Sequence, residues 1–296
     1  MSPAIAVIGV GEVGSAVIAA LVRGGRTVVA HDLRPEAAAA RLEAADVAGS
    51  VELVSLDAAG ACPLVLSAVI PTAAVDALEA LIQTQAARGD YLDVNSTGPE
   101  EKRRMAGLAQ QAGFSSFTDA TIGGGGFRLS SGPVFHIAGS GADTWSGVLG
   151  DAGFRTDVLG TTEADVGKAA SLKMMRTAFT KGYEALIVES LGLARRADLL
   201  EQVVDSVGET FDGIPFAEVA DLLVRGHVSH CQRRLGEVRM AKSTVEVLLP
   251  GCAIPMIEAT EQRYRASSEH LGERYGAPEP ADLREALLAL EVSGEP

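Results

Sequence analysis

Three glycines near the start of the chain, Gly9, Gly11 and Gly14, have the spacing G-x-G-x-x-G between a short apolar run and a helical pattern. In such a turn the first glycine permits a tight bend, the second lets the backbone approach a pyrophosphate, and the third allows close packing of helix and strand. The free amides at the start of the helix then face the phosphates. We therefore predict that this turn, including Glu12 and Val13, binds a dinucleotide.

An acidic residue after the next apolar run supports this prediction. Asp32 follows Gly11 by about 20 residues, where a carboxylate is expected to bind the ribose hydroxyls of the cofactor. A carboxylate there repels a 2′-phosphate, which favours NAD over NADP. Arg34 could instead pair with that phosphate, so NADP is the alternative cofactor. For the whole unit, the structural alternative is a glycine turn that binds nothing.

The alternation of strands and helices continues after Asp32. Residues 64–69 and 91–94 have the pattern of buried strands, and residues 72–88 form an alanine-rich helical pattern between them. Repeated strand and helix predict a parallel, doubly wound sheet, whose ligands bind beyond the carboxyl ends of the strands. The residues predicted at this crevice are Val69, Pro71 and Asn95 beside the cofactor and Ser96 and Thr97 beside the substrate. Ordinary turn chemistry is the alternative for each of them.

A run of four glycines from Gly123 to Gly126 is followed by Arg128. Their amides are not shielded by side chains and could form an anion-binding nest, to which Arg128 would add positive charge. A flexible surface loop is the alternative interpretation. His136 alternates with apolar residues, which predicts a core or edge histidine and not a catalytic one.

A long helix is predicted from Thr161 to Arg196, starting at a capping box formed by Thr162 and Asp165. Polar side chains fall in one sector of this helix: Lys173, Arg176, Thr177, Thr180, Lys181 and Glu184. The rest of the helix is too apolar to face mainly solvent, so the sector predicts a helix that lines a polar cavity; an amphipathic helix with one wet face is the alternative. The glycines within the pattern predict close packing or a break at Gly167, Gly182 and Gly192.

The remaining patterns divide the chain into two predicted domains, a dinucleotide-binding domain at 1–160 and an all-helical domain at 161–296. Helices are predicted in the second domain at 199–211, 216–223, 227–248, 255–271 and 281–291. A basic stretch between residues 225 and 239 predicts a solvated or interface surface, with a role in binding a substrate anion as the alternative.

Composition limits the possible partners. The formal charge of −14 would repel nucleic acid and anionic membranes, and no apolar run is long enough to span a bilayer. The N-terminus lacks the basic region of a signal peptide, and three widely spaced cysteines fit a reducing, cytoplasmic environment. No metal site is predicted.

With these motifs assembled, nearly the whole chain resembles the β-hydroxyacid dehydrogenase superfamily, which includes 3-hydroxyisobutyrate and 6-phosphogluconate dehydrogenases. The segments that carry the resemblance are IAVIGVGEVGSAV, LDVNSTGP, DATIGGG and VGKAASLKMMRT. The C-terminal half is similar to a less characterised, phosphogluconate-dehydrogenase-like branch. The resemblance implies a Rossmann domain, a helical domain that supports a homodimer, and a small carboxylate substrate.

The same resemblance assigns roles to individual residues. It implies that Lys173 is the catalytic lysine and that Gly123, Gly124 and Gly125 hold the substrate carboxylate. The chain departs from the family where Gly123 replaces a serine, Thr177 replaces an asparagine and Asn95-Ser96 replaces Ser-Thr. These departures leave the reaction type in place and the substrate open.

The mechanism expected is hydride transfer between nicotinamide and the hydroxyl-bearing carbon of a small hydroxy acid, with Lys173 moving the hydroxyl proton. An apolar helix and the nearby Arg176 would lower the pKa of the lysine, and Thr177 would hydrogen-bond the amine or the reacting oxygen. We assign Arg128 and Arg176 to the substrate site. An imine reductase and a non-catalytic dinucleotide-binding protein are the alternatives, and the presence of Lys173 argues against both.

Overall fold

The computed structural model describes residues 4–86, 89–123, 132–272 and 279–291. The chain folds as two compact units, Met1–Ala178 and Phe179–Pro296, which we call the N-terminal and C-terminal units. The division falls within the long helix α7 (Lys168–Arg196) and not at residue 160, where the sequence analysis placed the domain boundary. Residues of α7 up to Ala178 belong to the N-terminal unit, in which Ala169 and Ala170 are buried.

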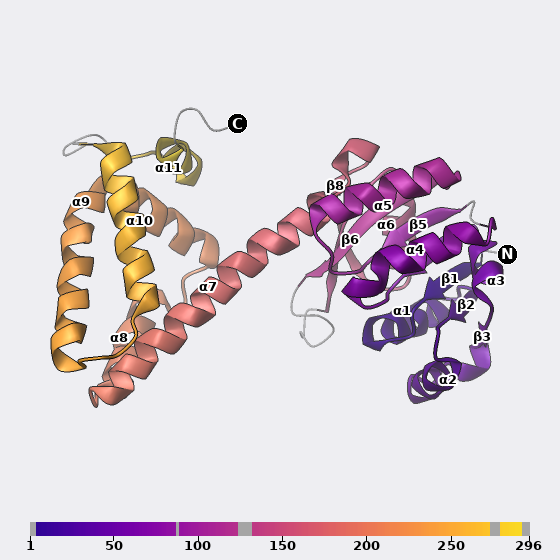
Figure 1. The fold of residues 1–296 in the computed structure, drawn as a ribbon, viewed down its shortest axis with the longest axis horizontal. Helices are drawn as coiled ribbons and strands as arrows, with labels where there is room; N and C mark the ends of the chain where they lie inside the picture. Colours follow the sequence, from indigo (N-terminus) through magenta and orange to yellow (C-terminus); the bar gives the residue numbers. More distant parts are fainter. Residues whose placement is uncertain (1–3, 87–88, 124–131, 273–278, 292–296) are drawn as a thin grey trace. The chain divides into compact units, whose positions relative to one another are not determined.

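One eight-stranded sheet forms the centre of the N-terminal unit (Figure 1). Its strands are β1 (Ile5–Ile8), β2 (Val28–His31), β3 (Val51–Leu53), β4 (Leu64–Ser67), β5 (Asp90–Asp93), β6 (Ser116–Gly123), β7 (Val134–Gly139) and β8 (Arg155–Gly160). Their order is β3-β2-β1-β4-β5-β6-β7-β8. Neighbouring strands from β3 to β6 pair in parallel, which confirms the predicted doubly wound sheet.

The sheet departs from the prediction where β6 and β7 pair antiparallel, with Thr121 opposite His136. Only residues 124–133 connect the two strands. A parallel crossover needs a dozen or more residues, usually including a helix, so this connection is too short to return to the start of the sheet. The last strand, β8, then pairs in parallel with β7.

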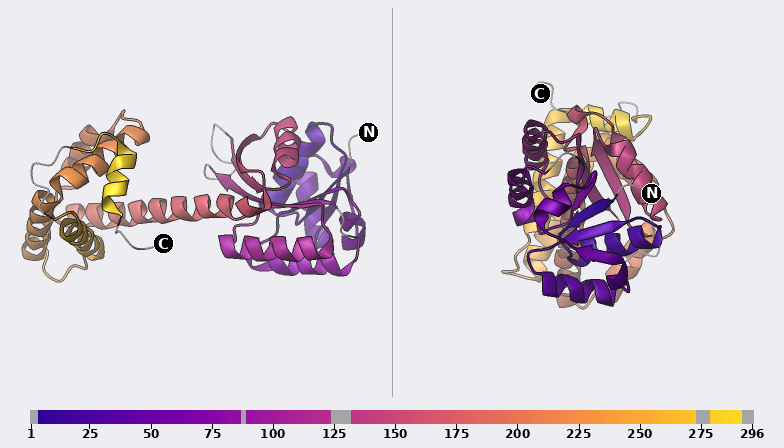
Figure 2. Two further views of the ribbon diagram at one scale, coloured as in Figure 1. Left: turned by 90° about the horizontal axis from the view of Figure 1, so that it is seen from above. Right: turned by 90° about the vertical axis from the view of Figure 1, so that its right-hand side faces the viewer.

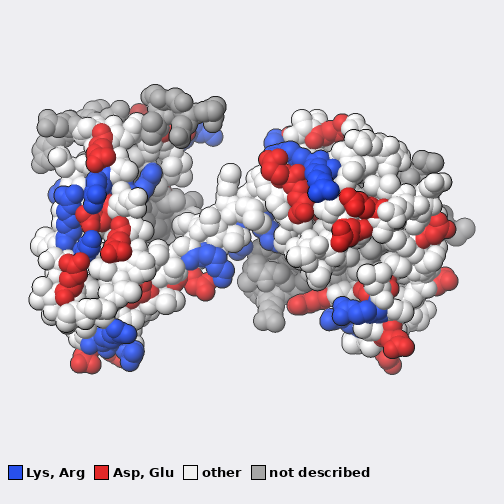
Figure 3. All heavy atoms as spheres, in the orientation of Figure 1, with Lys and Arg blue, Asp and Glu red and all other residues white. Residues whose placement is uncertain are grey.

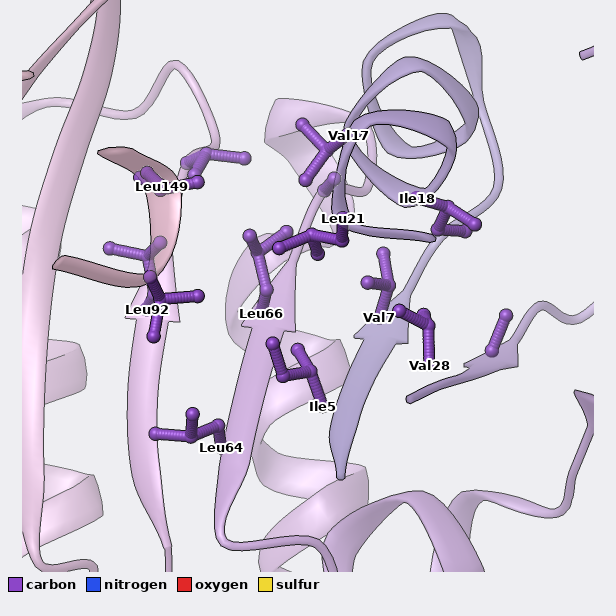
Figure 4. Packing of buried hydrophobic residues seen from close by; sticks show 14 of the residues in the cluster. Ile5, Val7, Val17, Ile18, Leu21, Val28, Leu64, Leu66, Leu92 and Leu149 are labelled. Atoms are coloured by element: carbon purple, nitrogen blue, oxygen red, sulfur yellow. The ribbon is translucent and has the colours of Figure 1, made fainter. Parts of the chain in front are cut away.

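Helices cover both faces of the sheet. They are α1 (Glu12–Arg23), α2 (Pro35–Ala44), α3 (Leu56–Gly60), α4 (Ala74–Gln83), α5 (Pro99–Ala112) and α6 (Ala142–Asp151), with 3-10 turns η1 (Ala48–Ser50), η2 (Pro71–Ala73) and η4 (Glu163–Asp165). On one face Val17 and Leu21 of α1 pack over Val7 and Leu66 of the sheet (Figure 4). On the other face the apolar core includes residues of α4 and α5. Strands buried on both faces explain their continuous apolar runs.

The sequence analysis did not predict α5, although its signals are present. Gly98 precedes the helix, Pro99 occupies its first turn with two glutamates, and Gly113 ends it with a φ of 86°. This combination is typical of a helix start and stop. In the sequence, five charged residues in succession, from Glu100 to Arg104, obscure the apolar face of this helix.

The start of α7 differs from the prediction. The capping box of Thr162 and Asp165 is present, but it begins the turn η4, and α7 itself starts at Lys168. Gly167 separates the two with a φ of +96°, and a Cβ there would lie 3.2 Å from the carbonyl oxygen of Pro99. The prediction of a break or close packing is therefore confirmed for Gly167. It is wrong for Gly182 and Gly192, because α7 is continuous through both and a Cβ at either position would meet no atom of another element within 4 Å among the described residues.

The C-terminal unit is all-helical in its described residues, as predicted, with α8 (Leu200–Phe211), α9 (Phe216–Leu248), α10 (Pro255–Leu271) and α11 (Leu283–Leu290). The predicted helices at 216–223 and 227–248 form α9, whose two helical segments meet at a kink, so the break lies at His230 and not at residues 224–226. Helices α9 and α10 lie side by side (Figures 1 and 2), and Val228 and Leu271 are part of their small core. Among the described helices, none is both long and apolar enough to cross a membrane.

Candidate dinucleotide site and the Lys173 centre

The glycine turn after β1 has the geometry that a dinucleotide requires. Gly9 has a φ of +93°, and a Cβ on it would lie 2.6 Å from the carbonyl oxygen of Ala68. A Cβ on Gly14 would lie 1.9 Å from the carbonyl oxygen of Gly9. Around Gly11, by contrast, the structure has no atom within 4 Å of the Cβ position. Two glycines thus allow close packing of the turn, and the third leaves open space beside the backbone, where a pyrophosphate fits.

The N-terminus of α1 is available to an anion. Its N-cap residue is Gly11, which has no side chain to accept the first amides of the helix. The Ser15 hydroxyl donates to the Gly11 carbonyl at 2.7 Å. The Ser15 side chain is therefore engaged there and does not occupy the amides of Glu12 and Val13. These residues fit the phosphates of a dinucleotide, which would gain hydrogen bonds and the positive end of the helix dipole.

Asp32 stands at the end of β2 against the same turn. Its Oδ2 accepts the Val10 amide at 2.8 Å, and its Oδ1 accepts the Arg34 amide at 2.8 Å. Each carboxylate oxygen retains a second lone pair, so the group can still accept hydrogen bonds from ribose hydroxyls. The Arg34 side chain is exposed. The carboxylate is therefore held in place by two backbone donors before any ligand binds.

The other predicted cofactor residues differ in orientation. The Val69 side chain lies beside the turn, with its Cγ1 2.9 Å from the Cβ position of Gly9, and Pro71 is exposed at the start of η2. The Asn95 side chain points into the protein: its amide donates to the Ser67 hydroxyl at 3.0 Å and to the Asp93 carboxylate. Any contact between Asn95 and a cofactor would therefore use its backbone.

Lys173 lies beside the loop that follows β5. Its amine donates to the hydroxyl of Ser96, so two residues predicted for the site are in direct contact. The amine is half-buried, and burial lowers the pKa of Lys173 below its usual value. The charges of Lys102 and Arg176 lower the pKa further. A lysine with a lowered pKa is neutral more often near pH 7 and can then act as a base.

A buried ionic cluster, which the sequence analysis missed, lies behind this centre. The Lys102 amine, on a side chain with 0% exposure, donates to the Asp93 carbonyl at 2.8 Å and to Asp93 Oδ2 at 2.6 Å. It also lies 3.2 Å from Asp119 Oδ1. The other oxygen of Asp119 accepts the amides of Gly167 at 3.1 Å and Ala170 at 3.0 Å. Burial raises the pKa of Asp93, and Lys102 opposes that rise.

The predicted substrate residues are only partly brought together. Arg176 and Thr177 are exposed on α7 within one turn of Lys173. Thr97, in contrast, is 5% exposed, and its hydroxyl has no hydrogen-bond partner among the described residues. Gly124, Gly125 and Arg128 lie outside the described residues, so their predicted roles stay predictions.

Gly123 ends β6 beside His136, and the contact explains why this position is a glycine. A Cβ at residue 123 would lie 2.7 Å from His136 Nε2, so the imidazole occupies the space of a side chain there. His136 Nδ1 lies 2.9 Å from Asp157 Oδ2, which agrees with the prediction of a core or edge histidine only in that the histidine has its own partner, since β7 is not an edge strand. The departure from the family serine is therefore compatible with the packing of this chain.

The apolar surface of α7 is not covered within the single chain. Met175 is 72% exposed and Val188 is 69% exposed. The sequence analysis expected a helix this apolar to be mostly covered, and that expectation is wrong for the isolated chain.

Among the described residues, no group of three or more His, Cys, Asp or Glu side chains is placed to hold a metal ion.

A dinucleotide-binding Rossmann protein is defined by three features found here: the glycine turn, the position of Asp32 and the order of the strands in the sheet. Residues 4–149 match the family model described as the NAD-binding domain of 6-phosphogluconate dehydrogenase, and residues 194–267 match a domain of unknown function, DUF1932. The chain therefore belongs to the β-hydroxyacid dehydrogenase superfamily and has an NAD(P)-binding domain of the dehydrogenase and reductase kind.

Solved structures similar to this chain cover almost all of it. A conserved hypothetical protein from Sinorhizobium meliloti is 30% identical, with a TM-score of 0.56 over 98% of this chain and 96% of that one. The protein MTH1747, described as structurally similar to 3-hydroxyacid dehydrogenases, is 26% identical, with a TM-score of 0.59 over 98% of this chain and 100% of that one.

Two further relatives add less about function. An imine reductase variant from Myxococcus stipitatus is 20% identical, with a TM-score of 0.73 over 98% of this chain and 99% of that one, and this likeness shows the fold alone. An uncharacterised 28.5 kDa protein of Methanothermus fervidus is 27% identical over 175 residues, which are 59% of this chain. The match spans 64% of the length of that curated relative.

Proposed function

We propose that the protein is an NAD(P)-dependent dehydrogenase that oxidises the hydroxyl group of a small hydroxy acid, with Lys173 as the general acid and base. The observation that carries the proposal is the half-buried amine of Lys173, held by Ser96 at the carboxyl end of β5, the edge of the sheet at which the glycine turn and Asp32 also lie. The likeness to MTH1747, a protein described as structurally similar to 3-hydroxyacid dehydrogenases, supports the reaction class. NAD is the preferred cofactor because of Asp32.

Each residue has a defined task in this mechanism. The cofactor supplies the hydride acceptor, at the nicotinamide ring. Neutral Lys173 accepts the hydroxyl proton as the C–H electron pair leaves the substrate carbon, so the amine becomes an ammonium while the alcohol becomes a carbonyl. In the reverse direction the ammonium returns the proton to the carbonyl oxygen. Ser96 orients the amine, Thr177 hydrogen-bonds the reacting oxygen, and Arg176 attracts the carboxylate.

The direct test replaces the amine. We expect Lys173→Ala to lower kcat/KM for hydroxy acids by about 100-fold or more, the usual contribution of a general base, with cofactor affinity nearly unchanged. The matched control is Lys168→Met, since Lys168 lies on the same helix but pairs with Asp165 at 2.6 Å. Turnover of an authentic substrate by Lys173→Ala at the normal rate would contradict the mechanism.

Substrate panels separate the alternatives. An imine reductase would oxidise NADPH or NADH with cyclic imines and leave hydroxy acids unchanged, and a fold shared with imine reductases is the observation behind this alternative. A non-catalytic binding protein would bind the dinucleotide tightly. The absorbance of the dinucleotide would then not change with any compound of either panel. We expect hydroxy acids to be the substrates because a lysine, which can exchange a proton with an alcohol, occupies the site.

A further inference from the structure

The buried cluster of Asp93, Lys102 and Asp119 connects the segments that carry the reaction centre. Asp93 ends β5 and leads through two residues to Ser96, which holds the Lys173 amine. Asp119 belongs to β6, and its Oδ2 accepts the two amides at the start of α7. Lys102 of α5 joins the two carboxylates. We refer to these three residues as the Lys102 triad.

The contacts form a closed circuit. It runs from the Lys173 amine to Ser96, along the backbone to Asp93, through Lys102 to Asp119, and from there to the Ala170 amide. Ala170 precedes Lys173 by less than one turn of α7, which returns the path to its start. A change at Lys102 therefore alters the relative position of the two sides of the Ser96–Lys173 contact.

Packing does not explain why a lysine occupies this position. Full burial of an ammonium carries a large desolvation penalty, and apolar side chains of similar volume often serve a core as well or better. Lys102 is 0% exposed and has two carboxylates, so its site is built for a cation. A cation at this position provides a fixed positive charge behind Lys173, which an apolar residue does not provide.

We propose that the Lys102 triad is the positioning support of Lys173: it fixes the amine beside Ser96 and holds the Lys102 ammonium as a fixed positive charge near that amine. This inference rests on the proposed function of Lys173 as the proton acceptor. The charged groups that act on the amine are Lys102 from α5 and Arg176 from α7, and Lys102 is itself paired with Asp93 and Asp119. Like charge disfavours the ammonium, so Lys102 supports a base.

The test compares variants that remove the cation with one that keeps it. Lys102→Met should raise the pKa of Lys173 by on the order of one unit, since a nearby like charge is lost. The acid limb of the kcat/KM profile for oxidation then moves to higher pH, and kcat/KM below that limb falls by about tenfold. Lys102→Arg should restore much of the normal profile. Asp93→Asn keeps Lys102 and removes a carboxylate, so the pKa of Lys173 should stay or fall.

A second readout does not require turnover. The chain has five lysines, so reductive ¹³C-methylation followed by NMR titration can report the pKa of Lys173, assigned with Lys173→Arg. If Lys102→Met destabilises the fold, the double variant Asp93→Asn/Lys102→Met removes the cation together with one carboxylate and leaves Asp119 with its backbone donors. This double variant should also raise the pKa of Lys173.

The outcomes separate the two proposals. A pKa of Lys173 that does not move in Lys102→Met overturns the role of the triad, and so does an equal rise in Asp93→Asn, which would indicate general structural disturbance. An NMR shift of the expected sign in a protein whose turnover does not depend on Lys173 would support the triad and reject the dehydrogenase mechanism.

Discussion

Two residues of the site, Lys173 and Asp32, are held in place by contacts inside the protein. Lys173 donates to Ser96, and Asp32 accepts two backbone amides. Side chains held in this way lose little further freedom when a ligand binds, which favours both affinity and orientation. Close contacts elsewhere explain two glycines, since a Cβ on Gly14 would clash with the carbonyl oxygen of Gly9 and a Cβ on Gly123 would clash with His136.

Cofactor choice is a prediction at the scale of one residue. We expect Asp32→Ser to raise the ratio of kcat/KM with NADP to kcat/KM with NAD by about tenfold or more, because the carboxylate no longer repels a 2′-phosphate. Arg34, two residues on, would then be free to attract that phosphate. The measurement is steady-state kinetics with both cofactors.

The control for this prediction is Glu43→Gln, which removes the same charge from an exposed position at the far end of α2. An equal shift in the control would assign the effect to net charge and not to position. An unchanged cofactor ratio in Asp32→Ser would show that residue 32 does not face the ribose.

At the scale of the helices, α10 is held by a carboxylate of α7 at its start and by a carboxylate of its own that pairs with α9. Glu189 of α7 accepts the amides of Met256 at 2.8 Å and Ile257 at 3.0 Å, which satisfies two free donors at the start of α10. Glu261 of α10 lies between Arg239 and Lys242 of α9, each at 3.2 Å, and Arg265 at 3.0 Å. Figure 3 shows Lys and Arg side chains mixed with Asp and Glu over α9 and α10.

Glu261 makes the stability of the C-terminal unit depend on pH. Hydrogen bonds from Arg265, Lys242 and Arg239 lower the pKa of Glu261 from 4.5 to about 2. A lowered pKa in the folded state stabilises the fold above the unfolded value, and this contribution is lost as the pH falls from 4.5 towards 2. We expect Glu261→Gln to lower the Tm at pH 7. The difference in Tm between this variant and the unmodified protein should vanish near pH 2.

Thermal unfolding between pH 2 and pH 7 checks this expectation, with Glu258→Gln as the matched control. Glu258 lies on the same helix and is exposed. A Tm difference for Glu261→Gln that persists at the lowest pH would mean that packing, and not the ionised carboxylate, stabilises α9 against α10.

At the scale of the whole molecule, exposed apolar side chains are the main unexplained feature of the single chain. Those of the C-terminal unit that are more than half exposed include Phe179, Tyr183, Val188, Phe216, Leu222, Met240, Val247 and Leu248. Soluble monomers rarely leave large contiguous apolar patches uncovered, so such residues usually mark a contact with another molecule. Together with the family resemblance, they favour a second copy of this chain as the partner.

We expect the protein to be a homodimer in solution at micromolar concentration. Val188→Glu should increase the monomer fraction, because a charge buried in an interface without a partner is costly. Light scattering coupled to size-exclusion chromatography measures the mass. Gln202→Glu, at an exposed position of α8, adds the same charge to a polar site and should leave the mass unchanged. A monomeric unmodified protein would reject the expectation.

The cofactor half of the site could be predicted because its determinants are local in sequence. The turn from Gly9 to Gly14 depends on residues within six positions, and Asp32 follows at the end of the next strand. The strands β1, β2, β4 and β5 and the helices α1 and α4 also follow from local periodicity, whereas α2, β3 and α3 are not predicted by it. The amine of Lys173 was identified by resemblance, since a lysine in a polar sector of a helix has no unique role.

Other features could be decided only by the tertiary structure. Lys102 stands among Glu100, Glu101, Arg103 and Arg104, a sequence that indicates a solvated surface, yet packing of α5 on the sheet buries this one amine between Asp93 and Asp119. His136 meets Gly123 only because β6 and β7 pair antiparallel. In both cases the partners come from separate elements, and short-range patterns in a sequence do not specify which elements meet.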